Sequence, residues 1–277
     1  MFKLFLKTII GNSEYDRELL KAARCSDLTV ETIDRLLHLG ADINTVSLER
    51  GGLQGYTHLT HYISKAFLDI QVVEYLIGRG ADPKLASKYG HTPLSSVPLE
   101  RQTRDEPEWS FKDSRTVMSL TRLLVENGAQ PNSRDSSGYT PLHSFVTCCS
   151  VDEVQLLLEL GASSCINQCG KRVQGNCYWG FSPLHTAVFR EGNHYGPRLP
   201  VIQLLIDWGA DVNQASNSNV NFTPLGLARD RKARLKGSLK AWLEGSLKDS
   251  SIKSGDLEAK IDEVGAIEAF LISKGAS

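Results

Sequence analysis

Apolar residues recur at helical spacing in several short segments of the chain. Between residues 151 and 160 they fall at 151, 154, 157 and 158, with polar residues between them. This spacing is typical of an amphipathic helix that buries one face. The same kind of pattern occurs at residues 32–39, 72–79, 116–127 and 199–208. We therefore expect a series of short helices of similar construction.

Each of these segments is followed by a glycine that begins a recurring phrase. The copies are Gly40-Ala41-Asp42, Gly80-Ala81-Asp82, Gly128-Ala129-Gln130, Gly161-Ala162-Ser163, Gly209-Ala210-Asp211 and, near the end, Gly275-Ala276-Ser277. Glycine readily takes the left-handed conformation that ends a helix. The phrase therefore predicts a helix end, and Gly161→Ala is expected to destabilise the protein.

A second phrase recurs between the first ones, and its best copy is Thr140-Pro141-Leu142-His143. The other copies are Thr57-His58-Leu59-Thr60, Thr92-Pro93-Leu94-Ser95, Ser182-Pro183-Leu184-His185 and Thr223-Pro224-Leu225-Gly226. A threonine hydroxyl can cap a helix, and proline is well tolerated at the first helical position. One unit is thus helix, turn, helix and a connecting segment. We call the segment from each Gly-Ala phrase to the next Thr-Pro-Leu-His phrase a finger.

The two phrases, in this order and with a helix between them, resemble the ankyrin repeat. The resemblance covers Leu19 to the C-terminus and implies an all-α solenoid of helix-turn-helix units with extended β-hairpin-like fingers. The first of six units lacks the Thr-Pro-Leu-His phrase, and the sixth is interrupted. We expect a cap at residues 1–15 and a repeat domain at residues 16–277. The approximate units are 16–54, 55–89, 90–137, 138–179, 180–220 and 221–277.

The spacing of the phrases reveals insertions. Two fingers span 12 residues from glycine to threonine, whereas the first spans 17 and the fourth 21. Two further insertions lie within units, because Thr92 to Gly128 is 36 residues and Thr223 to Gly275 is 52. We expect residues 97–113 to emerge between two helices, with Trp109 and Phe111 anchoring the excursion. Insertions in repeat proteins map to loops, which frequently carry function.

The composition and charge of the chain argue against several classes of protein. The chain has 277 residues, 41% of them hydrophobic and 23% charged, and a formal net charge of −1. This charge argues against binding a polyanion through the global field. Six cysteines are too few for a disulfide scaffold of this length, and the first ten residues, broken by Lys3 and Lys7, do not resemble a signal peptide. We expect a cytoplasmic protein, or one in a host cytosol if it is translocated.

Catalytic motifs are missing from the sequence. It contains no nucleotide-binding glycine-rich loop, no Gly-x-Ser-x-Gly and no His-Glu-x-x-His. His58 and His61 could share a helical face as metal ligands, but their place in a helix-start phrase favours a structural role. We predict that the protein is not an enzyme and needs no cofactor.

The fourth finger raises the question of a metal or redox site. Cys165, Cys169 and Cys177 could supply thiolates, with His185 as a fourth ligand. Structural zinc sites usually separate paired ligands by two to four residues, whereas the cysteine gaps here are three and seven. His185 also belongs to a helix-start phrase. A surface loop with Trp179 as an anchor is the favoured interpretation, so no metal site is predicted.

The resemblance implies that fingers and first helices line a concave face on which a protein partner docks. The alternative for any aromatic residue there is that it packs finger against finger. We expect a non-catalytic interaction module, monomeric when free, that acts as an inhibitor, an adaptor or a host-directed effector. The candidate partner-binding residues are Arg50, Leu53, Tyr56, Lys88, Tyr89, Arg134, Tyr178, Trp179, Phe189 and Arg190.

A basic segment at residues 229–248 allows a second function. Leu235, Leu239, Trp242 and Leu243 fall at helical spacing beside several lysines. A basic amphipathic helix can bind nucleic acid or a membrane surface. The favoured interpretation is an extra helix that covers the end of the repeats with its lysines outward. A final helix at residues 261–273 would then close the array.

Overall fold

The computed structural model describes residues 13–24, 28–48, 55–65, 68–98, 113–171, 180–189, 198–218, 222–244 and 254–277. The chain divides into two compact units, unit 1 at residues 1–144 and unit 2 at residues 145–277. The described regular structure is helical, which confirms the all-α prediction. Within the described residues, no helix is long and apolar enough to cross a membrane.

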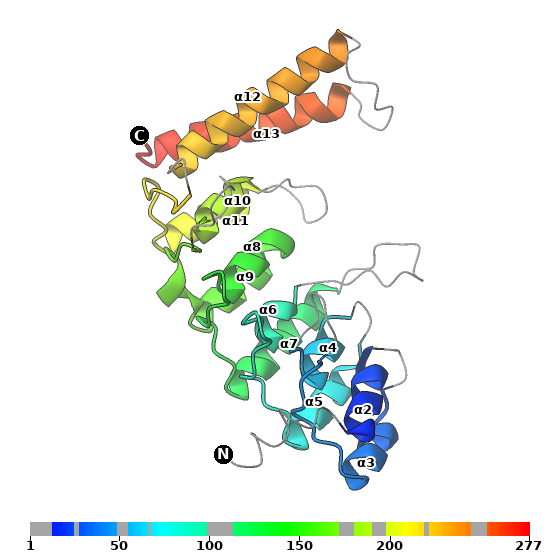
Figure 1. Ribbon diagram of the computed structural model, residues 1–277. Helices are drawn as coiled ribbons and strands as arrows, with labels where there is room; N and C mark the ends of the chain where they lie inside the picture. The colour runs from blue at the N-terminus through cyan, green and yellow to red at the C-terminus, as the bar shows by residue number, and fades with distance from the viewer. Residues whose placement is uncertain are drawn as a thin grey trace. The chain divides into compact units, whose positions relative to one another are not determined.

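The helices follow one another in pairs along the chain (Figure 1). In unit 1 they are α2 (Glu14–Arg24), α3 (Val30–His38), α4 (His58–Ile63), α5 (Ile70–Gly78), α6 (Pro93–Ser96) and α7 (Ser114–Glu126). Helix α8 (Pro141–Cys148) contains the division between the units. Unit 2 continues with α9 (Val151–Glu159), the 3-10 helix η1 (Ala162–Cys165), α10 (Pro183–Phe189), α11 (Leu199–Asp207), α12 (Pro224–Leu243) and α13 (Ser254–Ser273).

The Thr-Pro-Leu-His phrases begin first helices, as predicted. The hydroxyl of Thr92 accepts a hydrogen bond from the backbone N–H of Ser95 at 3.3 Å, and that of Thr223 from Gly226 at 3.1 Å. Thr57 and Ser182 cap α4 and α10 in the same way. Such a cap satisfies one of the backbone donors that a helix start leaves without an intrahelical partner.

Two layers of helices make up unit 1. The first helices α2, α4 and α6 contact one another in sequence, and so do the second helices α3, α5 and α7. Fully buried leucines of both layers meet between them, among them Leu19, Leu59 and Leu94 from first helices and Leu76 and Leu120 from second helices. Burying one such side chain contributes roughly 1.5–3 kcal/mol. The apolar stripe seen in the sequence is therefore the core of the repeats.

The predicted β-hairpin character of the fingers is not shown. Among the described residues there is no strand, and the only bridge is an isolated antiparallel one between Val46 and Thr57. The fingers are instead tight turns. In the second finger, the N–H of Ser87 donates to the carbonyl of His91 at 2.8 Å. In the third, Asp135 donates to Tyr139 at 2.9 Å.

The last repeat departs from the sequence prediction. Residues 229–248 were expected to break the unit with an extra helix, but α12 runs without interruption from the Thr223 cap to Leu243. Helix α13 begins at Ser254, seven residues before the predicted start at 261. These two 20-residue helices lie side by side (Figure 1). The insertion therefore lengthens both helices of an ordinary helix pair. The number of residues between the two phrases does not reveal this.

Adjacent fingers of unit 1 approach each other closely at Gly90. Its φ is +82°, and a Cβ atom there would lie 2.6 Å from the Cα of Asp135 in the next finger. The N–H of Ser136 also donates to the carbonyl of Tyr89 at 2.8 Å. A side chain at position 90 would force the two backbones apart.

We predict that Gly90→Ala lowers the free energy of unfolding by more than about 2 kcal/mol. Alanine is strained at a positive φ, and its Cβ would also collide with the backbone of the next finger. Gly161→Ala is the control, because φ is +111° but no atom lies within 4 Å of the added Cβ. It should cost only about 1 kcal/mol. Urea denaturation of both variants checks this, and equal losses would contradict the close approach of the fingers.

Candidate functional site

Three of the predicted binding residues are exposed on neighbouring fingers. Lys88 and Tyr89 lie in the second finger, and the Tyr89 side chain is 40% exposed. Arg134 lies in the third finger and is also exposed. The hydrogen bond from Ser136 to Tyr89 and the contact of Gly90 with Asp135 fix these two fingers against each other. Lys88, Tyr89 and Arg134 therefore stand on one supported surface, which we call the unit 1 finger surface.

Tyr56 lies elsewhere, in the interior of unit 1. It is only 5% exposed, and its ring lies 5.5 Å from that of His61 and 6.2 Å from that of His91 between centroids. Tyr56 therefore fits the alternative interpretation, in which an aromatic residue packs within the repeats. It cannot contact a partner without rearrangement.

Phe189 has a mixed environment at the end of α10. It is half-buried, and its ring packs edge-on against Phe181 with centroids 5.6 Å apart. Part of the ring thus supports the fold of unit 2. The remaining candidates, Arg50, Leu53, Tyr178, Trp179 and Arg190, lie outside the described residues, as do Trp109 and Phe111.

An asparagine ladder, which the sequence analysis missed, links successive Gly-Ala turns. The Nδ2 of Asn44 donates to the carbonyl of Gly80 at 2.9 Å, while its Oδ1 accepts from the N–H of Asp82 at 2.9 Å. Two asparagines of unit 2 make equivalent pairs, Asn167 with Gly209 and Asp211, and Asn213 with Gly275 and Ser277. Each amide thus sets the distance to the next repeat. The available signal was an asparagine shortly after four of the six Gly-Ala phrases, at Asn44, Asn132, Asn167 and Asn213.

His185 joins the start of α10 to the next finger. Its Nδ1 lies 2.7 Å from the Ser182 hydroxyl, and its Nε2 lies 2.7 Å from the carbonyl of Phe222. Because a carbonyl can only accept, Nε2 carries the proton and Nδ1 accepts from the hydroxyl. Burial lowers the pKa of His185 to about 4, against the opposing effect of the Phe222 carbonyl. Both ring nitrogens are therefore used by the fold.

The cysteines near His185 are likewise placed within unit 2. Cys165 and Cys169 are buried, and Cys177 lies outside the described residues. The thiol of Cys165 donates to the carbonyl of Ala162 at 3.0 Å. Across the described parts of the chain, no group of three His, Cys, Asp or Glu side chains could hold a metal ion.

The His58 and His61 pair is buried in unit 1. His58 Nδ1 lies 2.8 Å from the carbonyl of Ile43, which belongs to the preceding finger. Burial lowers the pKa of His58, so the neutral ring is favoured. His58 thus differs from His185: it holds the second position of its phrase and contacts the preceding finger, whereas His185 holds the fourth and contacts the next one.

Two buried arginines connect repeats within unit 2. The Nη1 of Arg198 donates to the carbonyl of Val146 at 3.0 Å, and that of Arg231 donates to the carbonyl of Val188 at 2.8 Å. Both carbonyls belong to the last turn of a first helix, α8 or α10, where no intrahelical donor is available. The two side chains are 1% and 5% exposed. In the sequence, Arg231 lies within a run of basic residues, and nothing there indicates that its side chain is buried.

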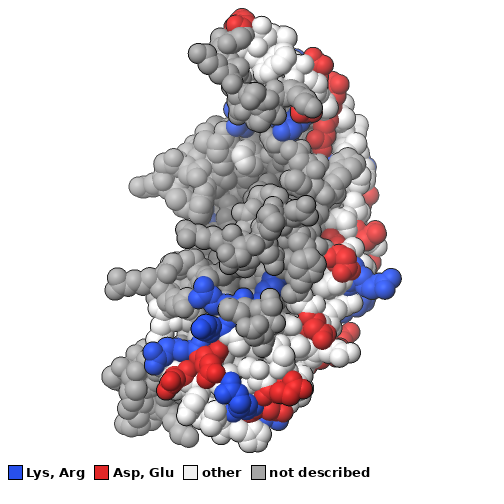
Figure 2. All heavy atoms as spheres, turned by 90° about the vertical axis from the view of Figure 1, so that its right-hand side faces the viewer, with Lys and Arg blue, Asp and Glu red and all other residues white. Residues whose placement is uncertain are grey.

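The cations of the basic segment are largely engaged by carboxylates. Arg229 and Lys232 both contact Glu268 of α13, at 3.3 and 2.8 Å, and their hydrogen bonds lower the pKa of Glu268. Arg234 pairs with Asp230 at 3.0 Å, and Lys240 lies 3.8 Å from Glu244. On the face shown in Figure 2, positive and negative side chains lie interspersed among the described residues. This pattern lacks the continuous basic stripe of a nucleic-acid site.

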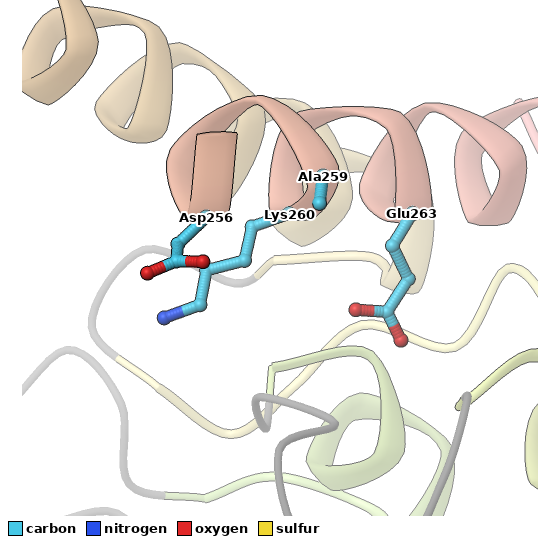
Figure 3. Close-up of a pocket in the computed structure, with 4 residues that line it drawn as sticks. All are labelled: Asp256, Ala259, Lys260 and Glu263. Atoms are coloured by element: carbon cyan, nitrogen blue, oxygen red, sulfur yellow. The ribbon is translucent and has the colours of Figure 1, made fainter. Parts of the chain in front are cut away.

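A shallow groove lies beside α13, with a volume of about 340 Å³. Asp256, Ala259, Lys260 and Glu263 line it, and the three charged side chains project to the same side of the helix (Figure 3). Glu263 also accepts a hydrogen bond from the backbone N–H of Arg198 at 3.2 Å. This contact joins α13 to the start of α11 and gives Glu263 a structural role.

Comparisons with known proteins agree with the geometry. Residues 114–216 match the family model described as ankyrin repeats, in three copies. The chain is 31% identical over 163 residues to the ankyrin repeat protein FPV031 of fowlpox virus (strain NVSL), covering 57% of this chain and 40% of the relative. It is 46% identical over 46 residues to an ankyrin repeat protein of Rickettsia bellii (strain RML369-C), covering 16% of this chain and 19% of that protein. The matches thus span less than half of either relative.

The fold also resembles a solved structure. The similarity is to a chain of the complex of the predatory endopeptidase Bd0816 from Bdellovibrio bacteriovorus with the immunity protein Bd3460. The TM-score is 0.55 at 18% identity, covering 81% of this chain and 95% of that chain. Residues 114–216 therefore contain ankyrin repeats, which confirms the resemblance seen in the two phrases over this part of the chain. Ankyrin repeats are protein-protein interaction modules.

The low pKa of His185 predicts a pH-dependent stability. The folded protein keeps the ring neutral down to about pH 4, whereas the unfolded chain binds a proton near the ordinary histidine pKa of 6.5. The unfolded state therefore holds more protons in this window, so the contribution of His185 is full above pH 6.5 and is lost as the pH falls toward 4. The loss can reach about 3 kcal/mol.

His185→Gln provides the test, because glutamine can serve at the third position of a capped helix and does not titrate. We expect the difference in unfolding free energy between the native protein and the variant to shrink as the pH falls from about 6.5 to about 4. Urea titrations across this range measure the difference. A difference that does not change with pH would contradict the neutral, buried ring.

The arginine contacts predict unequal costs for two similar substitutions. Arg198→Met leaves the Val146 carbonyl buried without its donor and should cost about 2–4 kcal/mol. Arg229→Met is the control, since Arg229 is 57% exposed and its ion pair with Glu268 should be worth less than about 1 kcal/mol. Equilibrium unfolding of both variants gives the comparison. Equal losses would show that the buried guanidinium does not hold the repeats together.

Proposed function

We propose that this protein is a non-catalytic binding module that recognises a dedicated protein partner through its fingers and first helices. The observation that carries the proposal is the unit 1 finger surface, where Lys88, Tyr89 and Arg134 are exposed on fingers held together by a backbone hydrogen bond. Tyrosine and arginine are enriched among the residues that dominate binding energy at interfaces. A surface ordered before binding also loses little conformational entropy on association.

The sequence insertions support a dedicated partner over a general scaffold. The fourth finger is longer than the regular 12-residue spacing and holds Tyr178 and Trp179. Irregular insertions that occur once fit the shape of one partner, whereas a repeated surface suits many. We propose that Trp179 is an anchor of the interface. Roles as an inhibitor, an adaptor or a host-directed effector would all use such a surface.

The alternative function, binding of nucleic acid or a membrane surface through residues 229–248, receives less support. Four of the cations in α12 contact three carboxylates within unit 2, so most of their charge is offset there. Neutralising phosphates with these side chains would require breaking those pairs. A nucleic-acid or membrane binder would instead depend on cations that are available to a polyanion.

The proposed function predicts a local loss of binding. Partners captured from a lysate of the source cells by the native protein should be lost with the double variant Tyr178→Ala, Trp179→Ala. Affinity for the recovered partner should fall more than about tenfold for Trp179→Ala, which corresponds to about 1.4 kcal/mol. Calorimetry measures this change once the partner has been purified.

Trp208→Ala serves as the matched control, since Trp208 is a 37% exposed tryptophan at the end of α11, outside the long finger. It should leave affinity unchanged. Capture of nothing but nucleic acid, released by salt, would overturn the proposal in favour of the basic segment. Equal capture by all variants would remove Tyr178 and Trp179 from the interface.

A further inference from the structure

The start of α4 differs from the other helix-start phrases at its second position. Four of the five phrases have proline there, at residues 93, 141, 183 and 224. The phrase that begins at Thr57 has His58 instead. Proline at the first helical position supplies a fixed φ and no polar side chain, whereas histidine supplies a ring that can bind a proton.

The ring of His58 joins the first repeat to the second. Its side chain is fully buried, and Nδ1 lies 2.8 Å from the carbonyl of Ile43. Because a carbonyl can only accept, Nδ1 carries the proton and donates it to this hydrogen bond. Ile43 follows the first Gly-Ala phrase, so the bond ties the turn after α3 to the start of α4. Helix α2 also packs against α4 (Figure 1).

Asp16 holds the same junction from the side of α2. Its side chain is buried, and its Oδ1 accepts a hydrogen bond from the N–H of Asp42 at 2.7 Å. Its Oδ2 accepts from the N–H of Ser13 at 2.9 Å. One carboxylate therefore joins the start of α2 to the turn that His58 holds against α4. The junction of the two repeats thus contains a buried carboxylate and a buried imidazole.

The second ring nitrogen makes this junction sensitive to protons. Nε2 of His58 is buried and makes no hydrogen bond with any described residue. A proton added there would create a buried charge whose new donor has no hydrogen-bond partner in place, which costs free energy. The carboxylates of Asp16 and Asp42 and the backbone of Ile43 and Asp16 favour the charged ring. Burial outweighs them and lowers the pKa of His58.

We propose that His58 is a pH-sensitive latch that holds α2 and α3 of the first repeat against α4 and releases them when its ring is protonated. The latch goes beyond the proposed binding function, because it gives the chain a second conformation without any partner. The first repeat can open by itself, since each unit of a repeat array packs only on its neighbours. Release would uncover the face of α4 that α2 covers.

The direction of the pH effect follows from the two states of the ring. In the closed junction the pKa of His58 lies below 6.5, and in the opened junction the exposed ring returns to about that ordinary value. The open form therefore binds more protons below pH 6.5. The contribution of the latch is full above this pH and is lost as the pH falls below it.

Hydrogen exchange of the full chain, compared at about pH 7.5 and about pH 5, tests the latch. Protection is the intrinsic exchange rate divided by the observed rate, so it is already corrected for pH. We expect the protection of α2 and α3 to fall at least about fivefold relative to that of α7 at the lower pH. The upper limit is about thirtyfold, which is the gain in proton binding by a ring of pKa 6.5 over this range.

Two variants of His58 separate the bond from the titration. His58→Pro installs the residue of the other phrases, and the extended backbone of Thr57, with ψ at 168°, suits a following proline. It removes both the bond and the titrating ring, so α2 and α3 should be less protected than in the native protein by the same factor at both pH values. His58→Asn keeps a neutral donor for the Ile43 carbonyl and should leave both helices protected at both pH values.

His185→Gln is the matched control, because it removes a buried histidine of unit 2. In this variant α2 and α3 should respond to pH as in the native protein. Circular dichroism at about pH 7.5 shows which variants are folded, and either His58 variant alone decides the question. A native protein without the fall in protection would overturn the latch, and so would a fall that persists without His58. An equal fall in α2, α3 and α7 would also overturn it, since the whole of unit 1 would then be unfolding.

Discussion

The repeats depend on side chains that satisfy the backbone groups of a neighbouring repeat. The helices from α2 to α11 are short, from 4 residues in α6 to 13 in α7, and isolated helices shorter than about 12–15 residues are marginal in water. Their ends leave carbonyls and N–H groups without intrahelical partners. Arg198 binds such a carbonyl at the end of α8, and Asn44 and His185 bind backbone groups of the turns beside a helix in another repeat. The helices of one repeat therefore depend on contacts with a neighbouring repeat, and those contacts form only when the helices are in place.

This constraint also explains why the fingers can form a binding surface without strands. A finger that is only a tight turn would move if it were attached at its ends alone. The asparagine pair at its base and the Ser136–Tyr89 hydrogen bond near its tip hold it at two points. The carboxylate of Asp135 further closes its own turn. An exposed side chain such as Tyr89 is thus carried on a backbone held at two points, which is what specific recognition requires.

The sequence predicted those features that are encoded within one repeat. Helical spacing placed α9 and α11 to within one residue at each end, and the Thr-Pro-Leu-His phrases predicted helix starts. Features that depend on a second repeat were missed. Nothing local marks Arg231 as buried among Arg229, Lys232 and Arg234, because its partner is a carbonyl 43 residues away. Likewise Tyr56 looks like a surface aromatic in sequence, and only its contacts with His61 and His91 show that it is interior.

The same argument separates the two kinds of charge in this protein. Cations in α12 face carboxylates of their own unit, so they stabilise a long helix pair at little cost to solubility. Carboxylates in the unit 1 fingers accept hydrogen bonds from the backbone N–H groups of their own turns, and Lys88 and Arg134 of the same fingers are exposed. Since electrostatic complementarity governs the choice of partner more than affinity, the placement of these charges bears on which proteins the fingers admit.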